Sequence, residues 1–300
     1  MTSTVVLGGT GYIGRQICEA FLALGHRVLV LARDPAKAPP GTRGKSVDLV
    51  NTDPRALAGL LTDEGCDVIV NAAGGVWVSD EERYRLNVTL VENLLVATTV
   101  LDRRPRLVHL GSAHEYKEFP PGSPLAVYAA SKHQATKLVV AATERGALDG
   151  VVLRLASVLG PHPAASGLLE TVIPRLRDAK ASGQSAVLYV ESPHACRDFI
   201  DVRDVADAVT AATVHRASGV IDVGGGRVVL VRELLELLVK ISGAPAEIIV
   251  RDAGGRASTE ERCLDITTAE ALLDWRPQRT LEQTLASAWS AYTGKGMVRE

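Results

Sequence analysis

The sequence predicts an α/β protein: a doubly wound parallel sheet with helices on both faces, followed by a smaller C-terminal lobe. In the first 160 residues, short runs of Val, Leu and Ile alternate with longer helical stretches. Strands that are apolar on both faces are typical of a parallel sheet covered on both sides. After Gly160 this alternation breaks down around Pro161 and Pro163, which indicates a separate lobe.

The hydrophobic pattern predicts each element in turn. We expect strands at 5–7, 27–31, 68–71, 107–110, 151–155 and 220–223, with a further strand just before Val47. We expect helices at 12–24, 86–101, 128–145, 168–181, 201–215 and 231–242. Gly25 ends the first of these helices, because glycine is favoured immediately after a helix.

Composition excludes several classes of protein. The chain has 300 residues, a net charge of −2 and a hydrophobic content of 46%, so neither disorder nor nucleic-acid binding by bulk charge is expected. No uncharged apolar run is long enough to span a membrane, and the first residues do not resemble a signal peptide. The cysteines have no metal-ligand spacing, so we expect reduced thiols, no metal site and a cytoplasmic protein: Cys18, Cys66, Cys196 and Cys263.

A glycine-rich turn directly follows the first strand and opens the first helix. Its small residues allow the backbone to approach a pyrophosphate, and the helix N-terminus supplies free N–H groups. A plain turn would also use glycine, but the strand–turn–helix context is the one that dinucleotide binding requires. The expected cofactor-binding residues here are Gly8, Thr10, Gly11, Tyr12, Ile13 and Gly14.

Arg33, at the end of the second strand, predicts NADP(H) as the cofactor. An NAD-specific site would place an acid there for the ribose hydroxyls, whereas a guanidinium matches a 2′-phosphate. Arg15 could assist, and a one-residue shift in register would put Asp34 in this place and favour NAD. Further expected cofactor contacts follow the third and fourth strands, where Asp48 could accept from the adenine amino group: Asp48, Leu49, Ala72, Ala73 and Gly74.

Tyr128 and Lys132 are predicted to lie on one helical face, since they are four residues apart. A tyrosine titrates near pKa 10, and a neighbouring ammonium would lower that pKa toward the range useful for proton transfer. Ser112 ends a strand, and ligands bind at the carboxyl ends of strands in such sheets. Ser112 could therefore orient a carbonyl oxygen toward Tyr128.

These residues together resemble the extended short-chain dehydrogenase/reductase superfamily, the group of nucleotide-sugar epimerases, dehydratases and reductases with a Rossmann domain. The resemblance also covers Asn87, the segment from Arg154 to Pro161, and Arg197 to Val202. It implies that Tyr128 transfers the proton, that Lys132 supports it and anchors the ribose, and that Ser112 holds the reacting oxygen. Asn87 and Leu155 would join the cofactor site.

The same resemblance implies the substrate contacts and the assembly. Arg197 would grip a nucleotide diphosphate, and the substrate site would comprise Ser112, Ala113, His114, Tyr128, Ser157 and Arg197. Ser157 stands where the family often has Asn. We expect residues 1–160 with 196–226 to form the dinucleotide-binding domain, and 161–195 with 227–300 the substrate lobe. A homodimer through helices 86–101 and 128–145 is implied, and Trp77 could shape the sugar pocket.

The residues after Ser112 bear on the reaction. The 4,6-dehydratases of this group carry an Asp-Glu pair where this chain has Ala113 and His114, which disfavours dehydration. The similarity is greatest to the deoxysugar 4-ketoreductases, so we expect NADPH-dependent reduction of a nucleotide-linked 4-keto-6-deoxyhexose. An NAD-dependent 4-epimerase would share every catalytic residue, and a non-catalytic nucleotide sensor on this fold is the third possibility.

Overall fold

The structure, a computed structural model, describes residues 1–75, 78–117, 119, 122–162, 167–190, 194–251 and 263–294. The chain divides into two units. The first comprises Met1–Leu155, Val205–Val223 and Ile266–Arg276. The second comprises Ala156–Asp204, Gly224–Asp265 and Pro277–Glu300.

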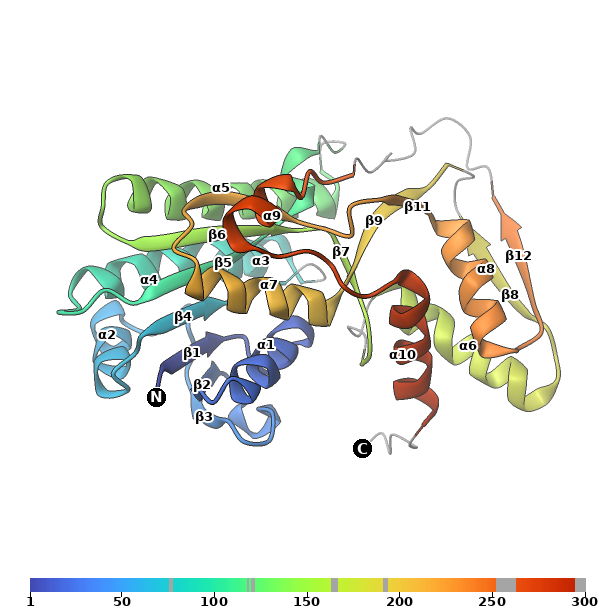
Figure 1. Ribbon diagram of the computed structural model, residues 1–300, viewed down its shortest axis with the longest axis horizontal. Coiled ribbons are helices and arrows are strands. Elements are labelled where there is room, and N and C mark those ends of the chain that lie inside the picture. The colour runs from blue at the N-terminus through green and yellow to red at the C-terminus, as the bar shows by residue number, and fades with distance from the viewer. Residues whose placement is uncertain are drawn as a thin grey trace. The chain divides into compact units, whose positions relative to one another are not determined.

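The first unit is built on a seven-stranded parallel sheet (Figure 1) in the order β10-β6-β5-β4-β1-β2-β3. Its strands are β1 (Ser3–Leu7), β2 (Arg27–Ala32), β3 (Arg43–Ser46), β4 (Val68–Asn71), β5 (Arg106–Ser112), β6 (Asp149–Leu155) and β10 (Gly219–Val223). The strand order reverses on either side of β1, and a ligand crevice forms at the carboxyl ends of the strands at such a switch point.

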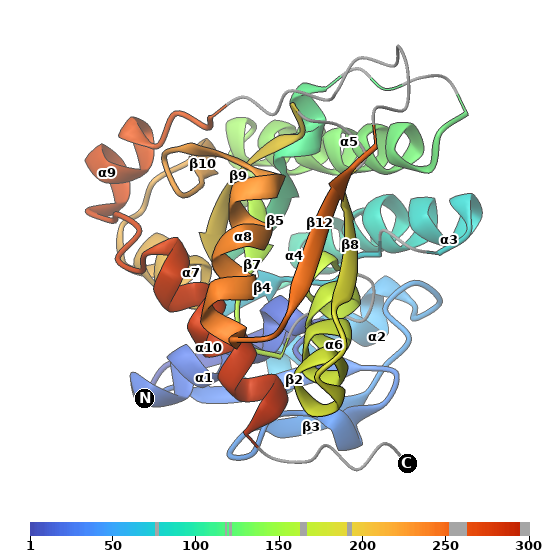
Figure 2. The same ribbon diagram turned by 90° about the vertical axis from the view of Figure 1, so that its right-hand side faces the viewer.

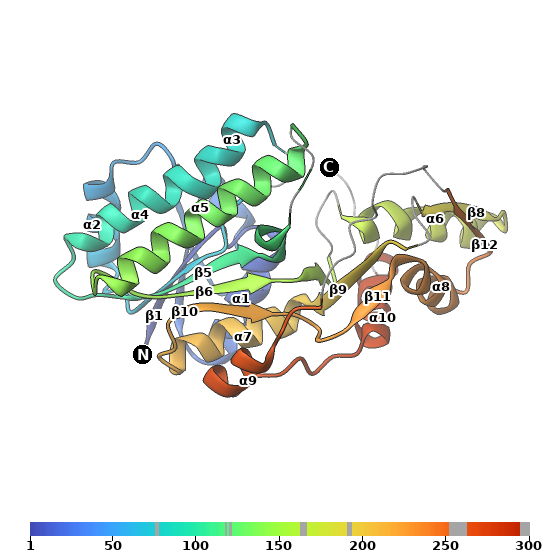
Figure 3. The same ribbon diagram turned by 90° about the horizontal axis from the view of Figure 1, so that it is seen from above.

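Helices cover both faces of this sheet: α2, α4 and α5 lie on one side, and α1 and α7 on the other (Figure 3). Every residue of β1 is buried. Val5 and Leu7 join Leu57, Leu94 and Val139 in one core cluster. The expected doubly wound α/β fold is therefore confirmed. The helices are α1 (Tyr12–Ala23), α2 (Pro54–Asp63), α3 (Asp80–Tyr84), α4 (Leu90–Thr99), α5 (Pro124–Glu144), α7 (Val202–Val214) and α9 (Thr267–Leu273).

The helix expected at 86–101 has a different start and an irregular turn. It begins earlier, at α3, where the Ser79 side chain accepts from the backbone N–H of Glu82. A π-helical turn, η2 (Arg85–Thr89), then joins α3 to α4. π-helical turns are rare in proteins overall, and those that do occur often lie at functional sites. Two short 3₁₀ turns complete the unit, η1 (Pro35–Lys37) and η3 (Ala113–Tyr116).

The second unit contains two small sheets, β11-β9-β7 and β12-β8. Figure 2 shows β8 and β12 side by side near α6 and α8. Apolar side chains of three helices form its core, among them Ile173, Leu238 and Leu285. Its elements are β7 (Ser157–Leu159), α6 (Leu168–Ser182), β8 (Ala186–Val190), β9 (Cys196–Asp201), β11 (Val228–Leu230), α8 (Val231–Ser242), β12 (Ala246–Val250) and α10 (Leu281–Thr293).

The observed division differs from the expected one: residues 156–160, 196–204 and 224–226, expected in the sheet domain, belong to the second unit. Strand β9, expected to return to the sheet domain, pairs instead with β7 and β11 in the second unit. Conversely, residues 266–276 belong to the first unit, where α9 packs against β10. Neither placement can be read from hydrophobic pattern, because both depend on pairing between segments far apart in the chain.

Within the described part of the chain, no helix is long and apolar enough to cross a membrane. The four cysteines all lie among the described residues, and none of them forms a disulfide. Burial raises the pKa of Cys18 and of Cys66 to about 12, so both thiols stay protonated and unreactive.

Candidate active site

The glycine turn between β1 and α1 leaves no space for side chains at two of its positions. Gly8 has φ +75°, and a Cβ there would lie 2.8 Å from the backbone Cα of Ala73 at the end of β4. A Cβ on Gly14 would lie 2.2 Å from the Gly8 carbonyl oxygen. The turn is thus packed closely against the residues after β4 and against the first turn of α1, whose N-terminus has no side-chain cap, the arrangement that cradles a pyrophosphate.

A cavity of about 490 Å³ lies beside this turn. Of the expected cofactor residues, Gly8, Thr10, Gly11, Arg33, Asp48, Leu49, Ala72, Ala73 and Gly74 line it. The described lining does not include Tyr12, Ile13, Gly14, Asn87, Tyr128, Lys132 or Leu155. The residues that follow β1, β2, β3 and β4 therefore line one site at the carboxyl ends of these strands.

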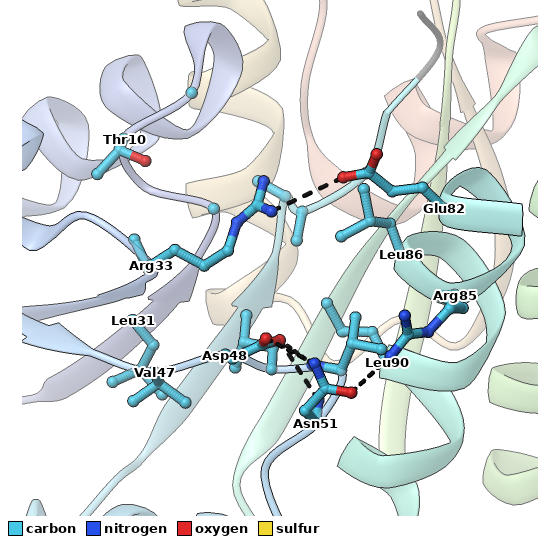
Figure 4. A pocket seen from close by; sticks show the side chains of 18 of the residues that line it. Thr10, Leu31, Arg33, Val47, Asp48, Asn51, Glu82, Arg85, Leu86 and Leu90 are labelled. Atoms are coloured by element: carbon cyan, nitrogen blue, oxygen red, sulfur yellow. Dashed lines mark hydrogen bonds and ion pairs between the residues drawn. The ribbon is translucent and has the colours of Figure 1, made fainter. Parts of the chain in front are cut away.

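Arg33 extends across this cavity toward α3 (Figure 4), where its guanidinium lies 3.7 Å from a carboxylate oxygen of Glu82. Asp34 is turned away, accepting from the N–H of Ala36 and pairing with Lys37. The register therefore places the arginine, and not the aspartate, in the cavity. Arg15, the other candidate for a phosphate contact, donates to the Lys37 carbonyl at 2.9 Å.

Asp48 lines the same cavity and is fixed there by its neighbours. Its carboxylate accepts from the Asn51 side chain at 2.7 Å and from the N–H of Val50, and Arg85 donates to the Asn51 amide oxygen (Figure 4). The hydrogen bond from Asn51, the largest cause, lowers the pKa of Asp48. Asp48 is thus an ionised acceptor, as hydrogen bonding to an adenine amino group requires.

Ser112, at the end of β5, and Tyr128, near the start of α5, form the candidate catalytic pair. Ser112 Oγ accepts from the backbone N–H of His114 at 3.2 Å. The His114 ring stands edge-on to the Tyr128 ring, with centroids 5.8 Å apart. Burial raises the pKa of Tyr128, a hydrogen bond with Ser112 opposes that shift, and the Glu115 charge adds to it. The phenol therefore keeps its proton at neutral pH.

This direction is opposite to the expected one. We expected Lys132 to lower the pKa of Tyr128, but desolvation outweighs the lowering hydrogen bond from Ser112. Lys132 is itself buried and donates to the Leu110 carbonyl at 2.9 Å. Burial lowers its pKa to about 8. The Lys132 ammonium therefore points to the Leu110 carbonyl, near the end of β5.

Lys132 nevertheless shares its surroundings with Gly74 and Asn87. A Cβ on Gly74 would lie 2.8 Å from Asn87 Oδ1 and 3.2 Å from Lys132 Nζ. Asn87, on the π turn, donates to Ser131 at 3.0 Å. Its buried Oδ1 has no hydrogen-bond partner among the described residues, and such an atom is costly unless a ligand or water satisfies it. A ribose hydroxyl fits both this acceptor and the ammonium.

Glu115 was not anticipated as a member of the site's supporting structure. Its side chain is fully buried, accepts from the N–H of Ser112 at 2.7 Å, and lies 3.3 Å from Arg154. Arg154 also lies 3.6 Å from Asp222 and over the ring of Tyr116. Glu115 faces the interior, so it does not replace the acid–base pair that a dehydratase carries, which agrees with Ala113 and His114 standing at those positions.

The remaining expected substrate residues, Ser157 and Arg197, belong to the second unit. Ser157 opens β7 opposite Phe199, and Arg197 lies on β9 opposite Val229. Asp198, a possible ion-pair partner for Arg197, accepts from the N–H groups of Gly225 and Leu264. Trp77 lies outside the described residues.

Sequence patterns did not single out three further polar residues that line the cavity with Arg33 and Asp48: Asn51, Glu82 and Arg85. The signal that was present is the run Ser79-Asp80-Glu81-Glu82, which marks a helix N-terminus. A helix beginning there places charged side chains opposite the second strand. Because these side chains are far from the glycine turn along the chain, the sequence did not indicate that they line the same cavity.

A dinucleotide cradle at the switch point, next to a Ser, Tyr and Lys at the ends of neighbouring elements, is the geometry of NAD(P)-dependent short-chain dehydrogenases and reductases. A profile of the NAD dependent epimerase/dehydratase family matches residues 4–224. The chain belongs to this family, which confirms the resemblance seen in the sequence.

Individual relatives and neighbours agree with this membership. The chain is 42% identical to dTDP-6-deoxy-L-talose 4-dehydrogenase (NAD(P)(+)) from Kitasatospora kifunensis, over 95% of this chain and 94% of that protein. It is 26% identical to GDP-6-deoxy-D-mannose reductase from Pseudomonas aeruginosa, over 98% of each. The UDP-glucose 4-epimerase of Thermus thermophilus, solved with NAD, superposes with a TM-score of 0.80 at 25% identity, covering 98% of this chain and 99% of that one.

Proposed function

We propose that this protein is a nucleotide-sugar 4-ketoreductase that reduces the C4 ketone of a nucleotide-linked 4-keto-6-deoxyhexose with NADPH. The observation that carries the proposal is the Ser112–Tyr128 pair, in which burial keeps the phenol protonated. A protonated phenol is the form needed to donate a proton to a developing alkoxide. The reverse reaction, oxidation of the 4-hydroxyl, uses the same groups.

The relatives support the sugar class. The Kitasatospora protein is named for the 4-position of a dTDP-linked 6-deoxyhexose, and the Pseudomonas protein for reduction giving a GDP-linked one. A 4-dehydrogenase oxidises a 4-hydroxyl to a 4-ketone, and a 4-ketoreductase catalyses the same reaction in the opposite direction. The identity of 42% to the first favours a dTDP-linked substrate over a GDP-linked one.

In the proposed mechanism, Ser112 Oγ holds the ketone oxygen and polarises the carbonyl, and Tyr128 protonates that oxygen as negative charge develops. Hydrogen bonding from two sides positions the reacting group, and positioning supplies much of the acceleration. Lys132 supports the resulting phenolate and binds a ribose hydroxyl together with Asn87. A bound nicotinamide would supply the hydride.

The substrate contacts are part of the proposal. His114 and Ala113 follow Ser112 on η3, and His114 Nδ1 lies 3.3 Å from Ser112 Oγ. Both are thereby close to the oxygen that Ser112 would hold. Arg197 and Ser157 in the second unit would contact the nucleotide diphosphate, a role that suits a guanidinium. On this proposal the second unit is the substrate lobe.

The test is incubation of the protein with NADPH and a panel of dTDP-, GDP- and UDP-linked 4-keto-6-deoxyhexoses. We expect NADPH consumption with one nucleotide series, and a product reduced at C4 by mass spectrometry and NMR. Binding of NADPH without turnover of any ketone would instead indicate a nucleotide sensor. Absence of both binding and turnover would contradict the assignment altogether.

A nucleotide-sugar 4-epimerase is the second candidate, supported by the likeness to the Thermus epimerase over nearly the whole chain. An epimerase retains NAD and returns the hydride to the same carbon. The two candidates separate in one assay: an epimerase converts a 4-hydroxy nucleotide sugar to its C4 epimer with no net change in NAD(P)H absorbance.

We also propose a homodimer through α4 and α5. Val96 on α4 and Val100, which directly follows this helix, are more than half exposed, which is consistent with an apolar surface that a second copy covers. Sedimentation equilibrium should show a dimer, and Val96→Asp should shift it to monomer.

A further inference from the structure

The cavity that would receive the adenosine ribose holds two opposite charges from different elements. Arg33 enters it from the end of β2 and Glu82 from the first turn of α3, and their charged atoms lie 3.7 Å apart (Figure 4). Both line the cavity. Their side chains are 71% and 44% exposed, respectively, so water screens the pair and its net strength is small.

The two forms of the cofactor place different demands on this pair. NADP(H) carries a 2′-phosphate dianion on the adenosine ribose, whereas NAD(H) carries a neutral hydroxyl there. To bind the phosphate, Arg33 must exchange the Glu82 carboxylate for it, and the dianion then lies close to a negative side chain. With NAD(H) the Arg33–Glu82 pair stays intact, and the hydroxyl can donate to either neighbouring carboxylate, Glu82 or Asp48.

The other charged groups of the cavity have separate partners. Asp48 is held by Asn51, although the Arg33 charge also lowers its pKa slightly. Arg85 donates to Asn51. Glu81 lines the cavity beside Glu82, but among the described residues the ion pair to Arg33 comes from Glu82.

We propose that Glu82 is a specificity-determining residue that competes with the 2′-phosphate for Arg33, so that the site accepts both NADP(H) and NAD(H). Arg33 alone would favour the phosphate strongly. Glu82 reduces that advantage without opposing the unphosphorylated ribose. This inference rests on the proposed use of a nicotinamide dinucleotide, and it names a residue on α3, not on the strand that usually decides the preference.

The test is equilibrium titration of the purified full chain with NADPH and with NADH, followed by nicotinamide fluorescence and without sugar substrate. Glu82→Gln should tighten NADPH binding by about fivefold, from relief of ion-pair competition and charge repulsion. The Kd for NADH should change by less than about twofold, since no phosphate is involved. The matched control is Glu92→Gln, which removes the same charge from an exposed position of α4 that does not line the cavity; it should alter both dissociation constants by less than about twofold.

A double-mutant cycle with Arg33→Ala separates competition from simple repulsion. The loss of NADPH affinity caused by Arg33→Ala should be larger in the Glu82→Gln background than in the wild type, because only there is Arg33 unopposed. Equal losses in both backgrounds, or equal effects of Glu92→Gln and Glu82→Gln, would overturn the inference. If the wild type binds neither NADPH nor NADH, the proposed function itself fails, and that outcome is distinct.

Discussion

The ammonium of Lys132 donates a 2.9 Å hydrogen bond to the carbonyl of Leu110, two residues before Ser112 on β5. The lysine is one helical turn from Tyr128, yet its hydrogen bond joins α5 to the strand. This contact fixes α5 against the strand that carries Ser112, so the serine and the tyrosine are held together by a residue whose ammonium also lies beside Gly74.

Tyr128→Phe should lower kcat by about 10²–10⁴-fold, because the variant lacks the proton donor. The Kd for NADPH should stay within about twofold of the wild type, since the phenyl ring still fills the space. Steady-state kinetics and fluorescence titration measure the two quantities.

Tyr116→Phe is the matched control. It removes a hydroxyl that donates to Asp222 at 2.9 Å, outside the proposed reacting pair, and should keep most of the turnover. Equal losses in the two variants would remove Tyr128 from the mechanism.

The rate constant kcat/KM for ketone reduction should fall as pH rises above about 8. Burial lowers the pKa of Lys132 to about 8, so above this pH the free enzyme loses the ammonium that supports the phenolate. In Lys132→Arg the decline should move to higher pH, because a guanidinium stays charged.

The same shift predicts a stability difference whose sign follows from linkage. The pKa of Lys132 is lower in the folded chain than in the unfolded one, so burial of the charge costs stability fully below pH 8. The cost disappears as pH rises through the window from about 8 to the unfolded value. Lys132→Met should therefore gain most, relative to the wild type, below pH 8 in urea unfolding. A constant difference across pH 7 to 10 would contradict the shifted pKa.

Gly8→Ala should lower the unfolding free energy by about 2–4 kcal/mol, combining a left-handed backbone with overpacking. It should also abolish dinucleotide binding, since the turn must move away from Ala73. Gly25→Ala is matched in φ, at +76°, but nothing lies within 4 Å of its Cβ. It should cost only about 1 kcal/mol and leave cofactor affinity intact. Equal costs would show that the contact with Ala73 is unimportant.

Glu115→Ala should lower the unfolding free energy by about 1–3 kcal/mol, because the buried Arg154 loses one of its two carboxylate neighbours and keeps Asp222 at 3.6 Å. Turnover should fall as well, since the N–H of Ser112 loses its acceptor. Glu115→Gln keeps an acceptor for Ser112 and should retain more activity. The exposed Glu92 provides a surface control, for which an alanine substitution should change stability by less than about 0.5 kcal/mol. A Glu115→Ala loss no larger than this would contradict the assigned role.

Local patterns were sufficient for much of the fold and part of the site. The expected strand at 68–71 and helix at 231–242 match β4 and α8 residue for residue, because each has a strong apolar pattern with clear ends. The glycine turn was readable because a sharp turn between a strand and a helix restricts residue type at each position. By contrast, the strands β7, β8, β9, β11 and β12 were not anticipated, since they lie outside the regular strand–helix alternation and pair with segments far apart in the chain.

The sequence by itself determined that the chain forms a doubly wound sheet with a dinucleotide cradle, since those features depend on local hydrophobic period and on glycine at sterically restricted positions. Only the tertiary structure decided which side chains lie close together. It pairs Glu82 with Arg33, and it places the Glu115 carboxylate against the N–H of Ser112. It also buries Tyr128, so that the pKa of this residue rises, whereas the nearby lysine had led us to expect a lower pKa. Charge interaction and desolvation depend on distances between side chains brought together from separate elements, and those distances exist only after the chain has folded.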